Sequence, residues 1–429
     1  MGSAWSGVST ETKSQIVPPI EKVTADSTDP RYRRLIHLLR LNHHEHAIYY
    51  HGLKYHNHLA YILVSAYMFG ASVDQLNDIY DKESKELEQW TDSPEEIDPD
   101  NWRAHFGAKE YQRAYLHFFE DETIRTNATV WSFLTDRCVP KDGPSYRDNQ
   151  LLHGLVEGVG HPLIHLGYAL EIEDKGLAME ALTMAATSYQ NVHEFVDNPS
   201  PPQTFLRITD MREIFTRIYD DDTFDAICER YGCGHPDRVL EEAPPYMLFD
   251  SYEIQKETMS TTFQTQVEAA TLMFIASHKE NNPQYDFFLA HAVTAAHALR
   301  IVLPQLSFQQ AWHVLRSHMV LSTMLYISQC RPNIKDDLVR NIDTTGKDWD
   351  YIRKQALEGE HRYDSHYVKV LRSFYEFEKL YGKGESDSDP KYDLYLKAAV
   401  KFADTFKGWT GFGTSNEPSL DTKMSNGSN

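Results

Sequence analysis

The sequence has few cysteines and few basic residues for its length. Its 429 residues include four cysteines, Cys138, Cys228, Cys233 and Cys330, and no pair has the C-x-x-C spacing. A disulfide framework is therefore not expected, and the thiols are typical of a reduced, intracellular protein, so we expect a cytoplasmic location. The 42 Lys and Arg stand against 63 Asp and Glu, a net charge of −21. This balance disfavours nucleic acid and anionic lipid as partners.

Several hydrophobic and catalytic patterns are also missing from the sequence. The first 20 residues lack a basic start followed by an apolar run, and we expect no segment to reach the 18 or more apolar residues of a membrane helix. We therefore expect no membrane insertion. There is no G-x-G-x-x-G after a strand, no G-x-S-x-G elbow and no second Glu-x-x-His motif. These absences disfavour a flavin or dinucleotide fold, a serine hydrolase and a ferritin-like di-iron bundle.

Apolar residues recur with the period of an α-helix along most of the chain, and strand signals are scarce. We predict an all-α fold in which residues 30–411 form a single large multi-helical domain with a buried site between helices. Residues 1–29 are expected to be an irregular arm, and residues 412–429, rich in Gly, Ser and Asn, a disordered tail. Helices are expected near 72–88, 108–120, 122–135, 148–172, 175–195, 207–219, 221–232, 250–279, 285–303, 307–330, 347–358, 364–382 and 389–407.

The segment from Gly160 to Gly167 places two histidines at the start of an expected helix. Pro162 fits the first helical turn, where its missing N–H costs nothing, so His161 is expected at the N-cap and His165 one turn further on. Two neutral imidazoles in this arrangement can hold one metal ion. An alternative stays open: His161 caps the helix and His165 is a hydrogen-bonded core histidine.

Three further segments supply histidines. His58 opens a strongly apolar helix and is expected to be buried, whereas the earlier histidines of that segment are expected on a solvated face. Small residues around His291 let another helix or a ligand approach closely, while His297, six positions on, points about 120° away. Only one of these two can then face a metal ion. His366 and Lys369 lie one turn apart on an otherwise apolar helix, where a lysine ordinarily extends its ammonium toward water.

Four segments, taken together and in order, carry the most specific signal in the sequence. They resemble the questin oxidase-like family, and the resemblance spans residues 40 to 380. The segments are Asn57-His58-Leu59 with Phe69-Gly70-Ala71-Ser72, the run HPLIHLGYALE from His161 to Glu171, the run HAVTAAHALR from His291 to Arg300, and Asp364 with His366 and Lys369.

The resemblance implies an activity. The family is fungal, acts in secondary metabolism, and oxidatively opens polycyclic aromatic ketones such as anthraquinones. Its members were first described as Baeyer–Villiger type oxidases that use NADPH. A related member is an iron-dependent dioxygenase that holds its iron with four histidines and a carboxylated lysine.

Carried over to this chain, the resemblance implies a site for Fe(II). His366 and His297 are alternative candidates for the ligand positions of this site. His366 either binds the ion or hydrogen-bonds the modified lysine, and His297 acts as a base or supports a ligand. Lys369 is implied to carry a carbamate derived from CO₂. The implied ligands are His58, His161, His165, His291 and Lys369.

Three functions are compatible with these observations. The first is an iron-dependent oxygenase that uses O₂ to cleave a ring of an anthraquinone-type polyketide, with Tyr168, Trp312 and Tyr367 as walls for the flat substrate. The second is an NADPH-assisted or metal-free Baeyer–Villiger oxidase of a polycyclic aromatic ketone, with a histidine as general base. The third is a non-enzymatic helical binding protein. The sequence indicates no oligomeric state.

Overall fold

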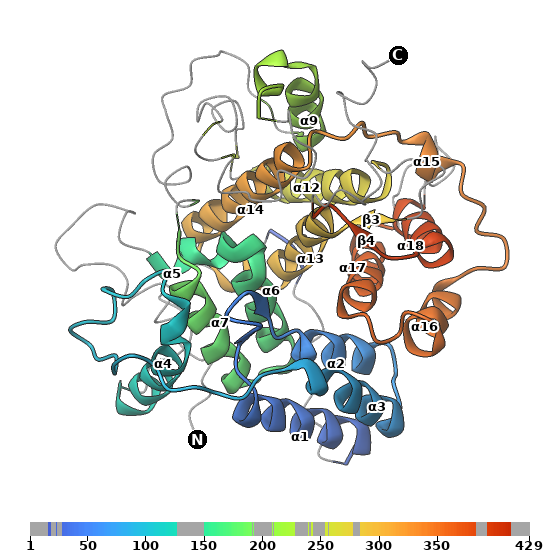
Figure 1. The fold of residues 1–429 in the computed structure, drawn as a ribbon. Coiled ribbons are helices and arrows are strands. Elements are labelled where there is room, and N and C mark those ends of the chain that lie inside the picture. The colour runs from blue at the N-terminus through green and yellow to red at the C-terminus, as the bar shows by residue number, and fades with distance from the viewer. Residues whose placement is uncertain are drawn as a thin grey trace. The chain divides into compact units, whose positions relative to one another are not determined.

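The computed structural model describes six stretches of the chain, and within them the predicted all-α class is confirmed (Figure 1). Strands there are only two residues long. The predicted arm and tail lie almost wholly outside the described residues. These are 28–126, 150–190, 210–227, 257–277, 284–382 and 393–412, with the isolated positions 16–18, 23, 192, 208, 239, 242, 254 and 255.

By their internal contacts the residues divide into two compact units, each assembled from segments that are distant in the sequence. Three helices continue from one unit into the other: α13 (Phe287–Val302), α14 (Phe308–Ser328) and α17 (Ser365–Tyr381). The single domain over residues 30–411 stays a prediction. Unit 1 comprises Met1–Asp197, Ala298–Val314 and Glu360–Val368, and unit 2 comprises Asn198–His297, Leu315–Gly359 and Lys369–Asn429.

Unit 1 is built around three helices with buried apolar residues, α2, α6 and α7. Helices α6 and α7 pack side by side in the green part of the chain (Figure 1). The short β1–β2 hairpin was not predicted, because its strands are too short to show an alternating pattern. The described elements of this part are α1 (Pro30–Glu45), β1 (Tyr49–Tyr50), β2 (Tyr55–His56), α2 (Leu59–Met68), α3 (Val73–Glu83), α4 (Gln112–Thr126), α5 (Gln150–His153), α6 (Glu157–Ile172) and α7 (Lys175–Thr187).

Side-chain caps account for several helix starts in unit 1. The Asp29 side chain accepts a hydrogen bond from the backbone N–H of Arg31, and Pro30 occupies the first turn of α1. Ser72 and Gln75 form a reciprocal capping box at the start of α3, as their spacing predicts. Asp174 caps α7 through the N–H of Leu177. Each cap satisfies N–H groups that the first helical turn leaves without a partner.

Helix α6 contains a left-handed turn near its start. Gly158, Val159 and Gly160 have φ values of 53°, 63° and 78°. Glycine adopts such angles readily, but a β-branched valine does so at a cost of about 1–3 kcal/mol. Regular helix follows this turn, so Pro162 lies in the first regular turn as expected. The turn therefore fixes the direction in which His161 leaves the backbone.

Unit 2 is also helical and carries one short parallel strand pair, in which Tyr285 lies opposite Trp409 and Asp286 opposite Thr410. This pair was not predicted, since its strands lie more than 100 residues apart. The predicted helix at 221–232 is replaced in its described part by a short 3₁₀ turn, Asp222–Phe224. The other elements are α9 (Met211–Asp220), α12 (Met259–Ile275), β3 (Tyr285–Asp286), α15 (Asp337–Arg340), α16 (Trp349–Glu358), α18 (Leu394–Thr405) and β4 (Trp409–Thr410), with parts of α13, α14 and α17.

One segment contradicts the expectation that no part of the chain is apolar enough to cross a membrane. Phe287–Gln305 meets that test by length and composition, and it alone does so among the described helices. Its most apolar window is 89% buried inside the protein. Such a helix is hydrophobic on all sides because it is covered on all sides.

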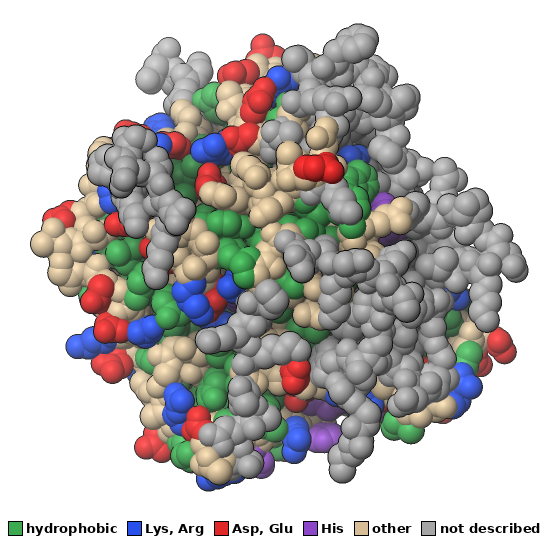
Figure 2. All heavy atoms as spheres, turned by 180° about the vertical axis from the view of Figure 1, so that it is seen from behind, with side chains coloured by type: hydrophobic (Ala, Val, Ile, Leu, Met, Phe, Trp, Pro, Cys, Tyr) green, Lys and Arg blue, Asp and Glu red, His purple; other side chains and the backbone are tan. Residues whose placement is uncertain are grey.

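The surface of the described residues carries charges of both signs. Figure 2 shows acidic and basic side chains scattered among one another on the face that it draws. The sequence as a whole has an excess of acidic residues, but on the described part of this face acidic and basic side chains are interspersed.

A close helix approach within unit 1 generates a stability prediction. A Cβ atom added at Gly167 of α6 would lie 2.8 Å from Ala298 Cβ and 3.0 Å from Ala298 Cα. We expect Gly167→Ala to lower the free energy of unfolding by about 1 kcal/mol or more, because overpacking costs about 1–3 kcal/mol and outweighs the gain in helix propensity of about 1 kcal/mol. Chemical denaturation measures this change. The double variant with Ala298→Gly should recover most of the loss, and additive losses in the two variants would contradict the contact.

Candidate metal centre

Three histidine rings of unit 1 meet at the starts of three helices. His58 precedes α2, His161 follows the left-handed turn of α6, and His366 lies in the first turn of α17. His58 Nε2 and His161 Nε2 are 3.0 Å apart. The centroids of the His58 and His366 rings are 4.5 Å apart. Asp364 caps α17 by accepting hydrogen bonds from the N–H groups of His366 and Tyr367, which explains its place in the fourth sequence segment.

The other ring nitrogens are held by the backbone. His161 Nδ1 lies 2.6 Å from the carbonyl oxygen of Gly158, and His58 Nδ1 lies 2.5 Å from that of His56. A carbonyl oxygen only accepts, so each Nδ1 carries the hydrogen and each Nε2 keeps its lone pair. The left-handed turn is what brings the Gly158 carbonyl to His161. Local backbone geometry thus directs both Nε2 lone pairs toward the same place.

His291, on α13, belongs to the same group. Its Nδ1 lies 2.8 Å from the carbonyl oxygen of Phe287, one turn earlier, so its Nε2 also keeps the lone pair. One ligand atom from each of His58, His161, His291 and His366 lies within 4.8 Å of the others. Three of these four histidines are buried, and His58 is partly buried.

A divalent transition-metal ion fits this group of atoms. Two Nε2 lone pairs that face each other at 3.0 Å repel unless a cation lies between them. Four neutral imidazoles are a donor set for iron, zinc, copper or nickel, and the group contains no carboxylate or thiolate. The donor chemistry therefore favours a metal ion over a structural cluster of hydrogen bonds.

His56 supports this group and was not singled out from the sequence. Its ring stacks on that of His161, with centroids 3.8 Å apart and planes 5° from parallel. The β1–β2 hairpin places it there, through pairing of His56 with Tyr49. Its sequence signal was weak, because it is one of several histidines in a His-rich stretch.

His165 lies outside the group of four, although the sequence places it one turn from His161. Its Nε2 is 2.8 Å from a carboxylate oxygen of Glu180, and its Nδ1 is 3.2 Å from the Tyr61 hydroxyl. Both ring nitrogens are therefore engaged within the core of unit 1. His366 takes the place in the group that His165 was expected to fill.

Glu180 is a further polar residue that the sequence analysis did not identify. Its second oxygen is 2.6 Å from His43 Nδ1, and His43 Nε2 is 3.1 Å from Glu120. His43 was expected on a solvated face, but its side chain is only 14% exposed. A lone glutamate inside the apolar helix α7 is the signal that could have revealed this cluster, since a fully buried acid is rare unless it is paired.

Hydrogen bonding sets the charges in this cluster. Burial alone lowers the pKa of His43, but hydrogen bonds to Glu120 and Glu180 and their charges outweigh it, so the pKa rises well above its usual value. Burial alone raises the pKa of Glu180, but hydrogen bonds to His165 and His43 and their charges lower it overall. The pKa of Glu120 is lowered, chiefly by its hydrogen bond to His43. At neutral pH the cluster contains two carboxylates and an imidazolium.

The remaining predicted site residues are buried or half-buried. Lys369 is fully buried, one turn after His366 on α17. His297 is buried, and its ring forms a T-shaped pair with the Phe377 ring at a centroid distance of 6.4 Å. Neither belongs to the group of four ligand atoms. Their predicted roles stay predictions.

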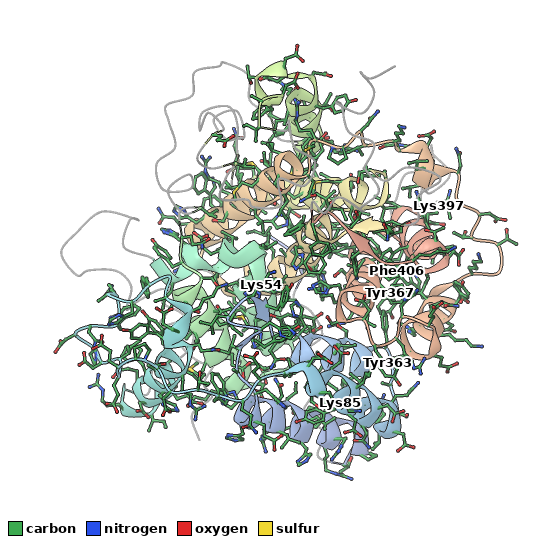
Figure 3. The ribbon with its side chains drawn as sticks, in the orientation of Figure 1. Lys54, Lys85, Tyr363, Tyr367, Lys397 and Phe406 are labelled. Carbon is green, nitrogen blue, oxygen red and sulfur yellow. The ribbon has the colours of Figure 1, made fainter. Side chains whose placement is uncertain are left out.

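The three predicted substrate walls lie in different surroundings. Tyr168 stacks on Tyr61, and its hydroxyl is 2.8 Å from Ser65 Oγ. Trp312 is half-buried with its ring against His313. Tyr367 lies on α17, where Figure 3 labels it, and is 1% exposed. Their contact with a substrate stays a prediction.

Comparison with known proteins gives the family. The profile described as Questin oxidase-like matches residues 55–374. The chain is 24% identical to a questin oxidase of Aspergillus fumigatus, over 91% of this chain and 92% of that protein. It is 24% identical to a Baeyer–Villiger monooxygenase of Aspergillus aculeatus, over 81% and 78% of the two chains. It is 22% identical to a Baeyer–Villiger oxidase of Emericella nidulans, over 85% of each.

These matches extend over the segments that carry the four histidines. The family predicted from those segments is confirmed, as is the prediction of an oxidoreductase. The chain belongs to the questin oxidase-like family.

Proposed function

We propose that this oxidoreductase is an iron-dependent oxygenase that uses O₂ to cleave a ring of an anthraquinone-type polyketide in fungal secondary metabolism. The group of four imidazoles carries the proposal. The names of the relatives, questin oxidase and Baeyer–Villiger oxidase, support a polycyclic substrate that the enzyme oxidises. Iron is preferred over zinc because zinc has no redox chemistry, whereas oxidation by O₂ needs a redox centre.

The ligands that we propose are His58, His161, His291 and His366. When bound, iron(II) would supply binding and activation of O₂ beside the substrate. The chain holds the rings in place: carbonyl oxygens fix the Nδ1 atoms of His58, His161 and His291, and buried surroundings limit access of water. Such outer contacts set both the tautomer and the direction of a ligand.

Lys369 is the residue that we propose to balance the charge of the metal ion. Four neutral imidazoles leave both positive charges of iron(II) uncompensated, and this is costly in a buried site. Lys369 is fully buried one turn after His366, and a buried ammonium is itself disfavoured. Reaction of its neutral amine with CO₂ gives a carbamate, which is an anionic oxygen ligand and removes both costs.

The second candidate function is a Baeyer–Villiger oxidation of the same class of ketone. The names of two relatives favour it, and NADPH is its expected cofactor. His297 would serve as a base in either reaction, and Tyr168, Trp312 and Tyr367 as walls for the substrate. Products made with ¹⁸O₂ separate the two reactions, because a dioxygenase incorporates both oxygen atoms and a Baeyer–Villiger oxidase incorporates one. The cytoplasmic location stays a prediction.

The ligand set generates a prediction about two histidines. His366→Ala should lower the iron content of protein purified without a His tag by at least about tenfold, because a ligand is lost. His165→Ala should keep the iron, since both of its ring nitrogens are engaged by other residues. Elemental analysis, with circular dichroism as a control for folding, measures both. Retained iron in His366→Ala together with lost iron in His165→Ala would restore the ligand set implied by the resemblance.

The carbamate generates a second prediction. Protein equilibrated with ¹³C-labelled bicarbonate should show one carbamate carbon signal in its NMR spectrum, and Lys369→Arg should abolish it, because a guanidinium does not form this adduct. Lys401→Arg, at a buried lysine of α18, is the matched control and should keep the signal. Iron content should fall in Lys369→Arg alone. A Lys369→Arg protein with the wild-type signal and wild-type iron rules out the carbamate.

A further inference from the structure

A continuous line of polar groups crosses unit 1 and is not used by the proposed metal site. It begins at Glu120 on α4, whose side chain is 35% exposed, and continues through His43 of α1 and Glu180 of α7 to His165 of α6 and Tyr61 of α2. Its four links measure 3.1, 2.6, 2.8 and 3.2 Å. Glu180 and His165 are almost fully buried.

Each of the three inner residues contacts its two neighbours in the line through two different atoms. His43 uses Nε2 toward Glu120 and Nδ1 toward Glu180, and Glu180 uses Oε1 toward His43 and Oε2 toward His165. His165 uses Nε2 toward Glu180 and Nδ1 toward the Tyr61 hydroxyl. An imidazole that accepts a proton on one nitrogen can release one from the other nitrogen without rotation of the ring, whereas Glu180 stays a carboxylate and pairs with either ring.

The inner end of the line lies beside the candidate metal centre. The Tyr61 and His58 rings form a T-shaped pair, with centroids 5.0 Å apart and planes at 82°. The backbone N–H of Tyr61 also donates to the carbonyl oxygen of His58. The outer end, Glu120, reaches solvent.

A purely structural role does not account for this line of buried charged groups. Removing charged groups from water is costly, and apolar side chains of similar size stabilise a core at least as well as a buried ion pair. Histidine lies on both sides of Glu180, and an imidazole ring can carry either one hydrogen or two. Glu180 is one anion, so it compensates one imidazolium at a time.

We propose that His43, Glu180 and His165 form a proton relay that takes a proton from the bound substrate at Tyr61 and releases one to water at Glu120. This inference rests on the proposed function, because a hydroxyanthraquinone supplies the phenolic proton. Tyr61 contacts the proton donor, while His43, Glu180 and His165 act through it.

The steps of the relay balance. In the resting state that we propose, His43 is the imidazolium, and His165 Nδ1 accepts a hydrogen bond from the Tyr61 hydroxyl. The substrate O–H bond breaks as its proton passes to Tyr61 oxygen, and the Tyr61 proton passes to His165 Nδ1. His43 then releases its Nε2 proton through Glu120 to water. The products are a bound phenolate and one proton in solution, and the imidazolium has moved from one side of Glu180 to the other.

The charges agree with this cycle. Glu180 remains a carboxylate throughout, consistent with its lowered pKa. Tyr61 gains one proton as it loses another, so its phenol does not ionise. Other titratable groups near the relay are His44 beside His43, and His117 and Arg113, whose charges act on Glu120. These groups lie at the outer end, so they affect release of the proton more than its uptake.

The first test replaces Glu180 by Gln, which keeps the shape and removes the charge. In the iron-loaded enzyme acting on questin, we expect kcat to fall by about 10²-fold with little change in KM and iron content. Glu122→Gln is the matched control, because Glu122 is equally buried on α4 and pairs with Arg125 instead. Its kcat should stay that of the wild type. Wild-type kcat in Glu180→Gln overturns the relay.

The second test separates a relay from a merely structural role. His43→Ala should lose turnover, and added imidazole should restore part of it in proportion to its concentration, because a free base then carries the proton away. Wild type should not respond to imidazole. Loss of turnover in His43→Ala with no response to imidazole, at unchanged iron content, contradicts the relay.

The third test needs no turnover, so it distinguishes failure of the relay from failure of the proposed function. Calorimetry in buffers of different ionisation enthalpy counts the protons released when 1,8-dihydroxyanthraquinone binds. We expect one proton per ligand in the wild type and in Glu122→Gln, and close to none in Glu180→Gln. The same count in all three proteins overturns the relay. An inactive wild type that still releases its proton through Glu180 refutes the oxygenase and keeps the relay.

Discussion

The site depends on hydrogen bonds from histidine Nδ1 atoms to backbone carbonyl oxygens. His58, His161 and His291 are each held in this way, at 2.5, 2.6 and 2.8 Å. Because a carbonyl oxygen cannot donate a hydrogen bond, these contacts fix one tautomer of each ring and leave the Nε2 lone pairs able to bind a metal ion. The rest of the site follows from this constraint: hairpin, left-handed turn and helix start are each positioned so that a carbonyl meets a ring.

Helix α6 carries two histidines that face different surroundings. His161 is directed by the left-handed turn toward His58, whereas His165, one turn on, is held by Glu180 and Tyr61. The helix therefore joins the proposed metal site to the proposed proton relay. The close approach of Gly167 to Ala298 holds the same helix against the start of the last third of the chain.

Charge balance connects the two proposals made for this protein. The group of four imidazoles has no anion of its own among the described residues, so a metal ion there needs a buried negative charge. In the second cluster the anion is Glu180, and in the proposed relay the imidazolium moves from one side of Glu180 to the other. A buried charge in either place needs an opposite charge close by, because removing a charge from water is costly.

The sequence by itself determined the all-α class, most helix positions and the family, and it predicted three of the four histidines that the structure groups. Helical periodicity, caps such as Ser72 with Gln75, and the order of His58, His161 and His291 are local properties, and local properties can be read from the chain. The sequence could not choose between His165 and His366. Spacing of four places two side chains near one face, but it does not say which partner occupies each ring.

Only the tertiary structure places His366 rather than His165 in the group of four, because the contacts that arrange these rings join residues distant in the chain. Glu180 engages His165 from another helix, and His58 meets His366 across more than 300 residues. The sequence predicted His43 on a solvated face, whereas in the structure Glu120 and Glu180 lie against its two ring nitrogens. Burial and pairing of a polar group depend on what packs against it, and one-dimensional patterns record only the near neighbours of each residue.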